Sequence, residues 1–226
     1  MLPFDSFTLV AATADLSDAA TDVAQEYAEA VEFRMDLAED PLEQLAAYDA
    51  DLPLLVTNRA SWEGGEADSD DARLEALEAA VADDAVAAVD IELAAMADGS
   101  GERVAEAART NDASVVVSTH DFEATPPTDA MVALLEDACE HGDVGKLAVT
   151  AETRGDALDV LTATHACDAT GDTVATMAMG EAGRHTRAVA PLYGSKIGYA
   201  PVDPEEATAP GQYDVATLAE LVARLQ

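Results

Sequence analysis

The stretch that decides the fold begins Ser114-Val-Val-Val-Ser-Thr-His-Asp-Phe122, continues through residues Thr128–Glu140, and ends Val144-Gly-Lys-Leu-Ala-Val-Thr-Ala151. The two outer segments are short and rich in valine, which is typical of buried β-strands. The middle segment is rich in alanine and follows Pro127, and this pattern is typical of a helix start. The stretch therefore predicts a strand, a helix and a second strand parallel to the first.

The same alternation recurs along the whole chain. The strand candidates are Phe7–Thr13, Val31–Leu37, Leu52–Arg59, Ala85–Leu93, Ser114–Phe122, Val144–Ala151, Thr173–Gly180 and Ile197–Val202. The helical stretches include Asp71–Ala82, Gly101–Arg109, Thr128–Glu140, Arg154–Ala166 and Val215–Leu225. Eight strands that alternate with helices predict one α/β domain over residues 1–226, a (β/α)8 or TIM barrel. A doubly wound open sheet is the alternative, but the first strand lacks the glycine-rich turn typical of that fold.

The sequence is strongly acidic. It has 46 Asp+Glu against 11 Lys+Arg, a formal net charge of −35, and 49% hydrophobic residues. The hydrophobic share predicts a globular core, while the charge argues against nucleic acid and membrane surfaces as partners, since both are anionic. Charge repulsion on this scale is costly in dilute buffer and is screened at molar salt, where the Debye length is about 3 Å. We interpret the chain as a halophile's protein, with an ordinary acidic cytosolic protein as the alternative.

No motif indicates export, membrane insertion or metal binding. Met1 to Val10 has no cationic stretch, and no apolar run reaches the roughly 20 residues of a membrane span. Cys139 and Cys167 lack CxxC spacing, so we expect reduced thiols in a cytoplasmic protein. The 4 histidines show neither HxxxH nor HExxH spacing, so we expect neither a metal nor a cofactor.

Ionisable residues gather where the predicted strands end, and the active site of such a barrel lies at these ends. They are Glu32, Arg34, Asp36, Arg59, Glu63, Asp90, Glu92, His120, Lys146 and Arg187. Because a buried charge is costly unless it is paired, charges that recur at one end of successive strands predict a site. Arg73 and four other arginines instead occupy helix or helix-edge positions.

Lys146 is one of only two lysines and lies in an apolar strand. Burial there disfavours the ammonium and favours a neutral, nucleophilic amine. Taken alone, such a lysine more often extends from a strand end to solvent, and a histidine such as His120 is more often a neutral core residue. The presence of His120 on the preceding strand, with arginines around both, favours the catalytic interpretation.

The motifs together resemble type I 3-dehydroquinate dehydratases over nearly the whole chain. They are Glu32-x-Arg34-x-Asp36, Thr57-x-Arg59-x3-Glu63-Gly64-Gly65, Ser118-x-His120-Asp121-Phe122 with Thr125-Pro126, Lys146-x-Ala148, Met179-Gly180-x2-Gly183-x3-Arg187, Gly194-Ser195 and Ala209-Pro210-Gly211-Gln212. Each motif is weak alone, and their specificity lies in their order at successive strand ends. The departures are Thr119 where an aromatic is common, Thr186 where serine is usual, and a slightly long loop before Thr208.

The resemblance implies a lyase that dehydrates 3-dehydroquinate to 3-dehydroshikimate by syn elimination, in the shikimate pathway of aromatic amino acid biosynthesis. By similarity, Lys146 would hold the substrate as an imine, His120 would move the proton, and Glu63 would orient His120. The substrate-binding residues implied are Glu32, Arg34, Arg59, Met179, Arg187, Tyr199, Thr208 and Gln212. Asp90 and Glu92 are either supporting charges near the lysine or a structural pair. The family also implies a homodimer.

Two other functions fit parts of the pattern. Another barrel lyase that forms an imine, such as an aldolase, would also place a lysine in a strand but would not need Glu63 paired with His120. A non-catalytic barrel could bind a small anion at the turn Gly180–Gly183 and at Gly194-Ser195, but would have no use for a buried lysine.

The charge generates the first prediction. The melting temperature is expected to rise steeply from dilute buffer to molar KCl, because salt screens repulsion among the 46 acidic side chains. Calorimetry over a KCl series measures this. A flat profile would contradict the halophile interpretation and leave the enzymatic one untouched.

Overall fold

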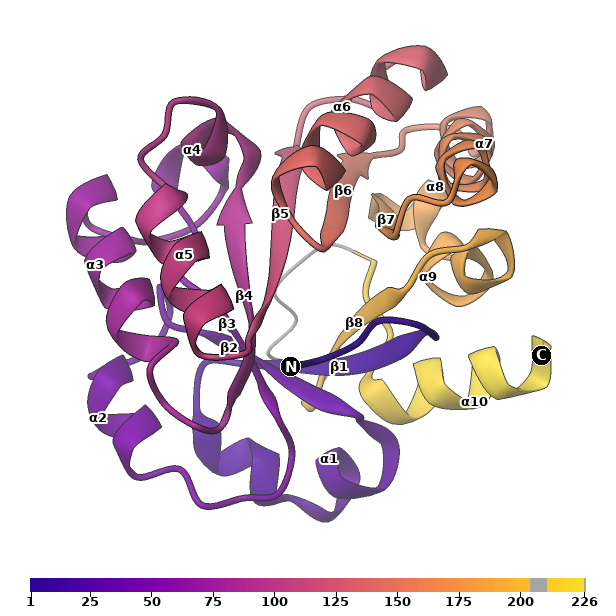
Figure 1. Ribbon diagram of the computed structural model, residues 1–226. Coiled ribbons are helices and arrows are strands. Elements are labelled where there is room, and N and C mark those ends of the chain that lie inside the picture. Colours follow the sequence, from indigo (N-terminus) through magenta and orange to yellow (C-terminus); the bar gives the residue numbers. More distant parts are fainter. Residues whose placement is uncertain (204–210, 226) are drawn as a thin grey trace.

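The computed structural model describes residues 1–203 and 211–225. Eight parallel strands form one sheet in the order β7-β6-β5-β4-β3-β2-β1-β8, with helices around the outside (Figure 1). The strands are β1 (Thr8–Thr13), β2 (Ala30–Arg34), β3 (Leu54–Thr57), β4 (Val86–Glu92), β5 (Ser114–Asp121), β6 (Val144–Thr150), β7 (Val174–Met179) and β8 (Ile197–Pro201). The predicted (β/α)8 barrel is confirmed, and the open-sheet alternative is wrong, because the strand order is sequential and the two end strands β7 and β8 meet.

The helices occupy the connections between strands. They are α1 (Asp22–Tyr27), α2 (Pro41–Ala46), α3 (Asp70–Ala80), α4 (Leu93–Ala97), α5 (Glu102–Thr110), α6 (Thr128–His141), α7 (Arg154–Thr170), α8 (Gly180–Gly183), α9 (Thr186–Val189) and α10 (Val215–Leu225). Three 3-10 turns complete them: η1 (Leu16–Ala20), η2 (Ser61–Glu63) and η3 (Ala190–Tyr193). Side-chain caps fix several starts, and α7 has a complete capping box between Thr153 and Asp156.

Some predicted strands are longer than the observed strands. The segment Leu52–Arg59 was expected to be a strand throughout, but β3 covers only Leu54–Thr57. Asn58 and Arg59 have left the ladder, and their side chains bond to α3 and β4 instead of continuing the sheet. Asn58 and Arg59 therefore belong to the loop at the carboxyl end of β3.

The barrel closes between β7 and β8. At this seam the Lys196 N–H donates to the carbonyl of Val174 at 2.8 Å, and the Thr176 N–H donates to Ser195 Oγ at 3.0 Å. The β8 strand pairs over five residues with β1 on its other side. A side-chain hydroxyl therefore replaces part of the ladder at the closure.

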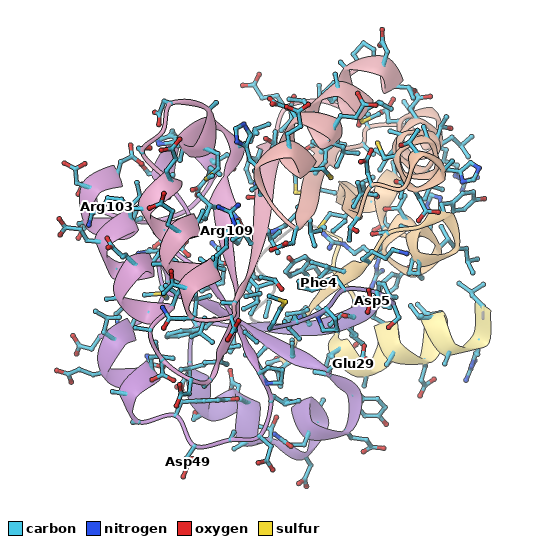
Figure 2. All side chains as sticks on the ribbon, viewed as in Figure 1. Phe4, Asp5, Glu29, Asp49, Arg103 and Arg109 are labelled. Carbon is cyan, nitrogen blue, oxygen red and sulfur yellow. The ribbon has the colours of Figure 1, made fainter. Side chains whose placement is uncertain are left out.

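The amino-terminal segment plugs one end of the barrel. Figure 2 places Phe4 near the barrel axis, where it packs with Leu2 against inward-facing side chains of the strands. The Leu2 N–H donates to the carbonyl of Ala87, and Ser114 Oγ donates to the carbonyl of Leu2. With this end filled, the carboxyl ends of the strands are left to form a cavity.

Helix α6 approaches β6 closely at Gly145. A Cβ at this glycine would lie 2.7 Å from the carbonyl oxygen of Leu135 and 2.8 Å from Cys139 Sγ, so only glycine fits. This contact holds β6 against α6 at the residue that precedes Lys146.

Candidate active site

A cavity of about 70 Å3 opens at the carboxyl ends of the strands. Its lining residues are Glu32, Arg34, Thr57, Arg59, Glu63, Gly64, His120, Phe122, Lys146, Ala148, Met177, Met179, Arg187, Tyr199 and Gln212. The cavity thus brings together every catalytic and substrate-binding residue implied by the family resemblance except Thr208, which lies outside the described residues. Lysine, histidine, carboxylates and arginines share one small space.

The register of two strands places Lys146 and His120 on the same inner face. In the β5–β6 ladder Ser118 pairs with Lys146, and His120 pairs with Ala148. Because side chains alternate with a period of two, His120 lies one pleat nearer the mouth than Lys146. The lysine is at the floor of the cavity and the histidine is above it.

Lys146 is held by a carboxylate and an aromatic ring. Its side chain is 5% exposed, and Nζ donates to Asp90 Oδ2 at 2.8 Å. The same Nζ lies 4.4 Å from the centroid of the Tyr199 ring, within the range of a cation–π interaction. The sequence left the role of Asp90 open, and the structure places it directly on the lysine.

Asp90 is itself tied to Arg59 and Ser118. Its Oδ1 accepts from Arg59 Nη2 at 2.7 Å and from Ser118 Oγ at 2.6 Å. Burial acts to raise the pKa of Asp90, but Arg59 and then Lys146 outweigh it and hold that pKa well below its usual range. Asp90 therefore stays ionised and provides the negative charge that pairs with Lys146.

Arg59 connects three carboxylates. Besides Asp90, its Nη1 lies 3.1 Å from Glu92 Oε1 and 3.4 Å from Glu63 Oε2. Burial alone would lower the pKa of Arg59, but Asp90, Glu92 and Glu63 together raise it. The guanidinium is therefore a permanent cation committed to this network, although the residue also lines the cavity.

Glu63 reaches the cavity from η2, a turn that depends on two glycines. Gly64 adopts the left-handed region at φ 79°, and a Cβ at Gly65 would lie 2.1 Å from the carbonyl oxygen of Arg59. This folding presents Glu63 Oε2 to His120 Nδ1 at 2.9 Å. The pairing implied by the family resemblance is therefore present in the geometry.

The surroundings shift the pKa values of both partners. Burial raises the pKa of Glu63 to about 7, against the opposing effect of Arg59. Burial lowers the pKa of His120 well below its usual value, and Arg59 and Lys146 lower it further. His120 is therefore neutral at pH 7, and Glu63, which is ionised above about pH 7, then accepts the Nδ1 proton. This tautomer leaves Nε2 as a free base, since the two ring nitrogens then differ in role.

A second group of polar residues lies on the side of β2. Arg34 forms two hydrogen bonds to Asp36, at 2.9 and 2.7 Å, in the planar arrangement typical of arginine and carboxylate. Glu32 is 5% exposed and accepts a hydrogen bond from the Thr57 hydroxyl at 2.9 Å. These two residues present a cation and an anion to the cavity.

Arg187 provides a buried cation at the β7 side. It lies on α9 and is 4% exposed. Its Nη1 is 3.9 Å from Met177 Sδ. Burial lowers the pKa of Arg187 to about 10, so it stays cationic at neutral pH. Thr186, the departure from the usual serine, retains the hydroxyl that accepts from the Ala178 N–H and donates to Gly183. The turn that carries Arg187 is therefore held by a hydroxyl that threonine and serine share.

The sequence reasoning missed one residue of the network. Arg73 was assigned to a helix position, but its guanidinium is buried and bonds to Glu92 at 2.6 Å. A signal was present, because Arg73, Leu77 and Ala80 recur at the spacing of one helix face, and the other two are core residues.

A buried lysine at the carboxyl ends of a (β/α)8 barrel, beside a histidine bound to a carboxylate, is typical of enzymes that hold a carbonyl substrate as an imine. The comparisons with known proteins narrow this class. A family model described as type I 3-dehydroquinase matches residues 7–226. The chain belongs to the type I 3-dehydroquinase family.

Relatives and solved structures agree with this assignment. The chain is 60% identical to a 3-dehydroquinate dehydratase of Haloarcula marismortui, over 100% of this chain and 99% of the relative. It is 56% identical to that of Halobacterium salinarum, over 100% of both chains. A crystal structure of the enzyme from Geobacillus kaustophilus superposes with a TM-score of 0.85 at 28% identity, covering 98% of this chain and 92% of that one. The family resemblance is confirmed, and the halophilic archaea among the relatives support the halophile interpretation.

Proposed function

We propose that this chain dehydrates 3-dehydroquinate to 3-dehydroshikimate by a syn elimination in which Lys146 carries the substrate as an imine. The reaction follows from membership of the family, and it favours the dehydratase over the aldolase and the non-catalytic barrel. The observation that carries the mechanism is the position of Lys146 Nζ, on the cavity floor against Asp90 and one pleat below His120.

The chemistry divides between the lysine and the histidine. The Lys146 ammonium gives a proton to His120 Nε2, and the resulting neutral amine attacks the ketone. The protonated His120 returns that proton to the oxygen that leaves as water, which gives a protonated imine that withdraws electrons from the neighbouring carbon. His120 Nε2 removes a proton from that carbon and returns it to the departing hydroxyl, which leaves as water. Hydrolysis then releases the product and restores Lys146. Glu63 stabilises the imidazolium that forms between these steps.

The substrate carboxylate and hydroxyls have partners of matching charge around the cavity. Arg187 and Gln212 bind the carboxylate, and Glu32 and Arg34 bind ring hydroxyls. Met179 and Tyr199 form the apolar walls, while Thr208 is proposed by family resemblance alone. Arg59 contributes chiefly by fixing Asp90, since its guanidinium is already bonded there. The proposal assigns no role to a metal ion or cofactor.

Covalent trapping tests the nucleophile. Borohydride added with substrate is expected to attach one reduced carbocycle to Lys146, because reduction makes the imine permanent. Intact-mass measurement and peptide mapping locate the label. Lys146→Ala is expected to take no label and show no turnover, and label on Lys196, the other lysine, would contradict the assignment.

The matched control removes the base and keeps the nucleophile. His120→Ala is expected to form the imine still, with turnover lowered by about 10²- to 10⁴-fold, as for loss of a general acid–base group. Near-normal turnover would show that the proton moves through another residue.

The Glu63–His120 pair predicts the pH dependence. Glu63 faces Arg59, Asp90, Glu92 and His120, and below its pKa of about 7 it is protonated and no longer accepts the Nδ1 proton. The value of kcat/KM is therefore expected to fall as pH drops through about 7. Glu63→Gln is expected to lower kcat about 10-fold or more and to lose this limb. A limb near pH 4 to 5, or one that persists in the Gln variant, would argue against Glu63.

Assembly and location are proposed on separate grounds. We expect a homodimer by family resemblance. Exposed apolar side chains on α7 and η3 could form its interface, and they are Leu158, Leu192 and Tyr193. Sedimentation in molar KCl tests this, and the 23.4 kDa mass of one chain would contradict it.

A cytoplasmic location agrees with the free thiols of Cys139 and Cys167, on the neighbouring helices α6 and α7. Alkylation during lysis under denaturing conditions is expected to modify both cysteines, because unfolding exposes the buried Cys167, and a disulfide between them would contradict this location. Among the described residues, no helix is long and apolar enough to cross a bilayer.

A further inference from the structure

Arg73 is a buried cation that does not line the cavity. It lies in the first turn of α3, is 2% exposed, and bonds through Nη1 to Glu92 Oε2 at 2.6 Å. Its Nε bonds to Asp70 Oδ1 at 2.7 Å. A helix residue therefore commits its whole charge to two carboxylates, one of which belongs to the network of Lys146.

Glu92 transmits this contact to the loop that carries Glu63. Its second oxygen, Oε1, accepts from the backbone N–H of Ala60 at 2.9 Å and lies 3.1 Å from Arg59 Nη1. Ala60 immediately precedes η2. By holding Glu92, Arg73 therefore fixes the point where the turn begins.

Arg73 holds the same turn from its outer side. Its guanidinium carbon lies 5.8 Å from the ring centroid of Trp62, and Trp62 Nε1 donates to Asp70 Oδ1 at 3.1 Å. Trp62 is 51% exposed, so burial alone does not fix its ring. Because Trp62 precedes Glu63, the contacts of Trp62 with Arg73 and Asp70 limit the movement of Glu63, the residue that meets His120.

The buried charges of the network balance only when Arg73 is counted. Its buried carboxylates are Glu63, Asp90 and Glu92, and its cations are Arg59, Lys146 and Arg73, while Asp70, the other partner of Arg73, is 56% exposed. Without Arg73 the set would have three anions against two cations, and Glu92 would compete with Asp90 for Arg59. An unbalanced buried carboxylate is costly, so the remaining groups would rearrange.

We propose that Arg73 is a positioning residue for the reaction, which acts through Glu92 and Trp62 to hold η2 so that Glu63 meets His120. The inference rests on the proposed function, because it concerns the proton-transfer pair. It predicts that a side chain with no access to substrate nonetheless controls turnover.

The test compares Arg73→Met with Arg103→Met. Arg103 is an exposed arginine on α5 that pairs with Glu78 at the surface and lies at the outer edge of the molecule (Figure 2). In Arg73→Met, kcat is expected to fall by about 10- to 100-fold while KM stays within about twofold, as for a misplaced catalytic group. The acid limb of the pH profile is expected to move to higher pH, because the unbalanced Glu92 disfavours ionised Glu63. Arg103→Met is expected to match the wild type.

Arg73→Lys separates charge from geometry. It restores the cation but not the planar fork, so it is expected to return the acid limb to its wild-type position and recover kcat only in part. An unchanged kcat in Arg73→Met would overturn the proposal. So would a lower kcat with an unmoved limb, since that result indicates a general loosening of the fold.

A second variant covers failure to fold. If Arg73→Met shows no cooperative melting, the variant Trp62→Leu replaces it, because it removes only the contacts of Trp62 with Arg73 and Asp70. Its kcat is expected to fall a few-fold, and an unchanged kcat would overturn the proposal. Wild-type turnover is measured in the same KCl buffer. An inactive wild type would contradict the proposed function, whereas only an active one tests the role of Arg73.

Discussion

The ion pair between Lys146 and Asp90 is the interaction on which the rest of the site depends. Burying either charge alone would cost on the order of several kcal/mol, so both must be balanced inside the barrel. Asp90 is balanced further by Arg59, which in turn meets Glu63 and Glu92. A nucleophile placed in an apolar strand therefore requires charges from β3 and β4 at matching depth.

The network also sets the protonation of the proton-transfer pair. The cations Arg59 and Lys146 help to keep His120 neutral, while burial raises the pKa of Glu63 to about 7. Tuning of this kind is how one site supplies both a base and its partner near neutral pH. The ion-pair network that stabilises Lys146 at the cavity floor thus also sets the protonation state of His120 above it.

The distribution of cations answers the problem of an anionic surface. With only 11 basic residues against 46 acidic ones, the chain places Arg34, Arg59, Lys146 and Arg187 around one cavity. An anionic substrate repelled by the surface therefore meets these four cations inside the cavity. At high salt this attraction acts only at short range, so direct contacts must supply the binding.

Much of this could be predicted from the sequence, because strand periodicity and strand-end charges are local signals. All eight strands and the ionisable cavity residues were found in this way, whereas Met179, Tyr199 and Gln212 were identified by the family resemblance. The Arg73–Glu92 contact was not found, because it depends on where α3 places Arg73 relative to the end of β4, and a charged residue in an acidic helix resembles a solvent-exposed one. The role of Asp90 likewise needed the register that aligns β4 with β5 and β5 with β6. Long-range pairing, and not residue type, was the missing information.

The most direct test of the central claim is a crystal structure of the borohydride-reduced adduct. The account predicts a carbon bonded to Lys146 Nζ, with Asp90 still bound to Arg59 and within hydrogen-bond distance of that nitrogen. It also predicts His120 Nε2 against the neighbouring carbon, with Glu63 on Nδ1. An adduct in which Asp90 has released Arg59, or in which the ring faces away from His120, would contradict it.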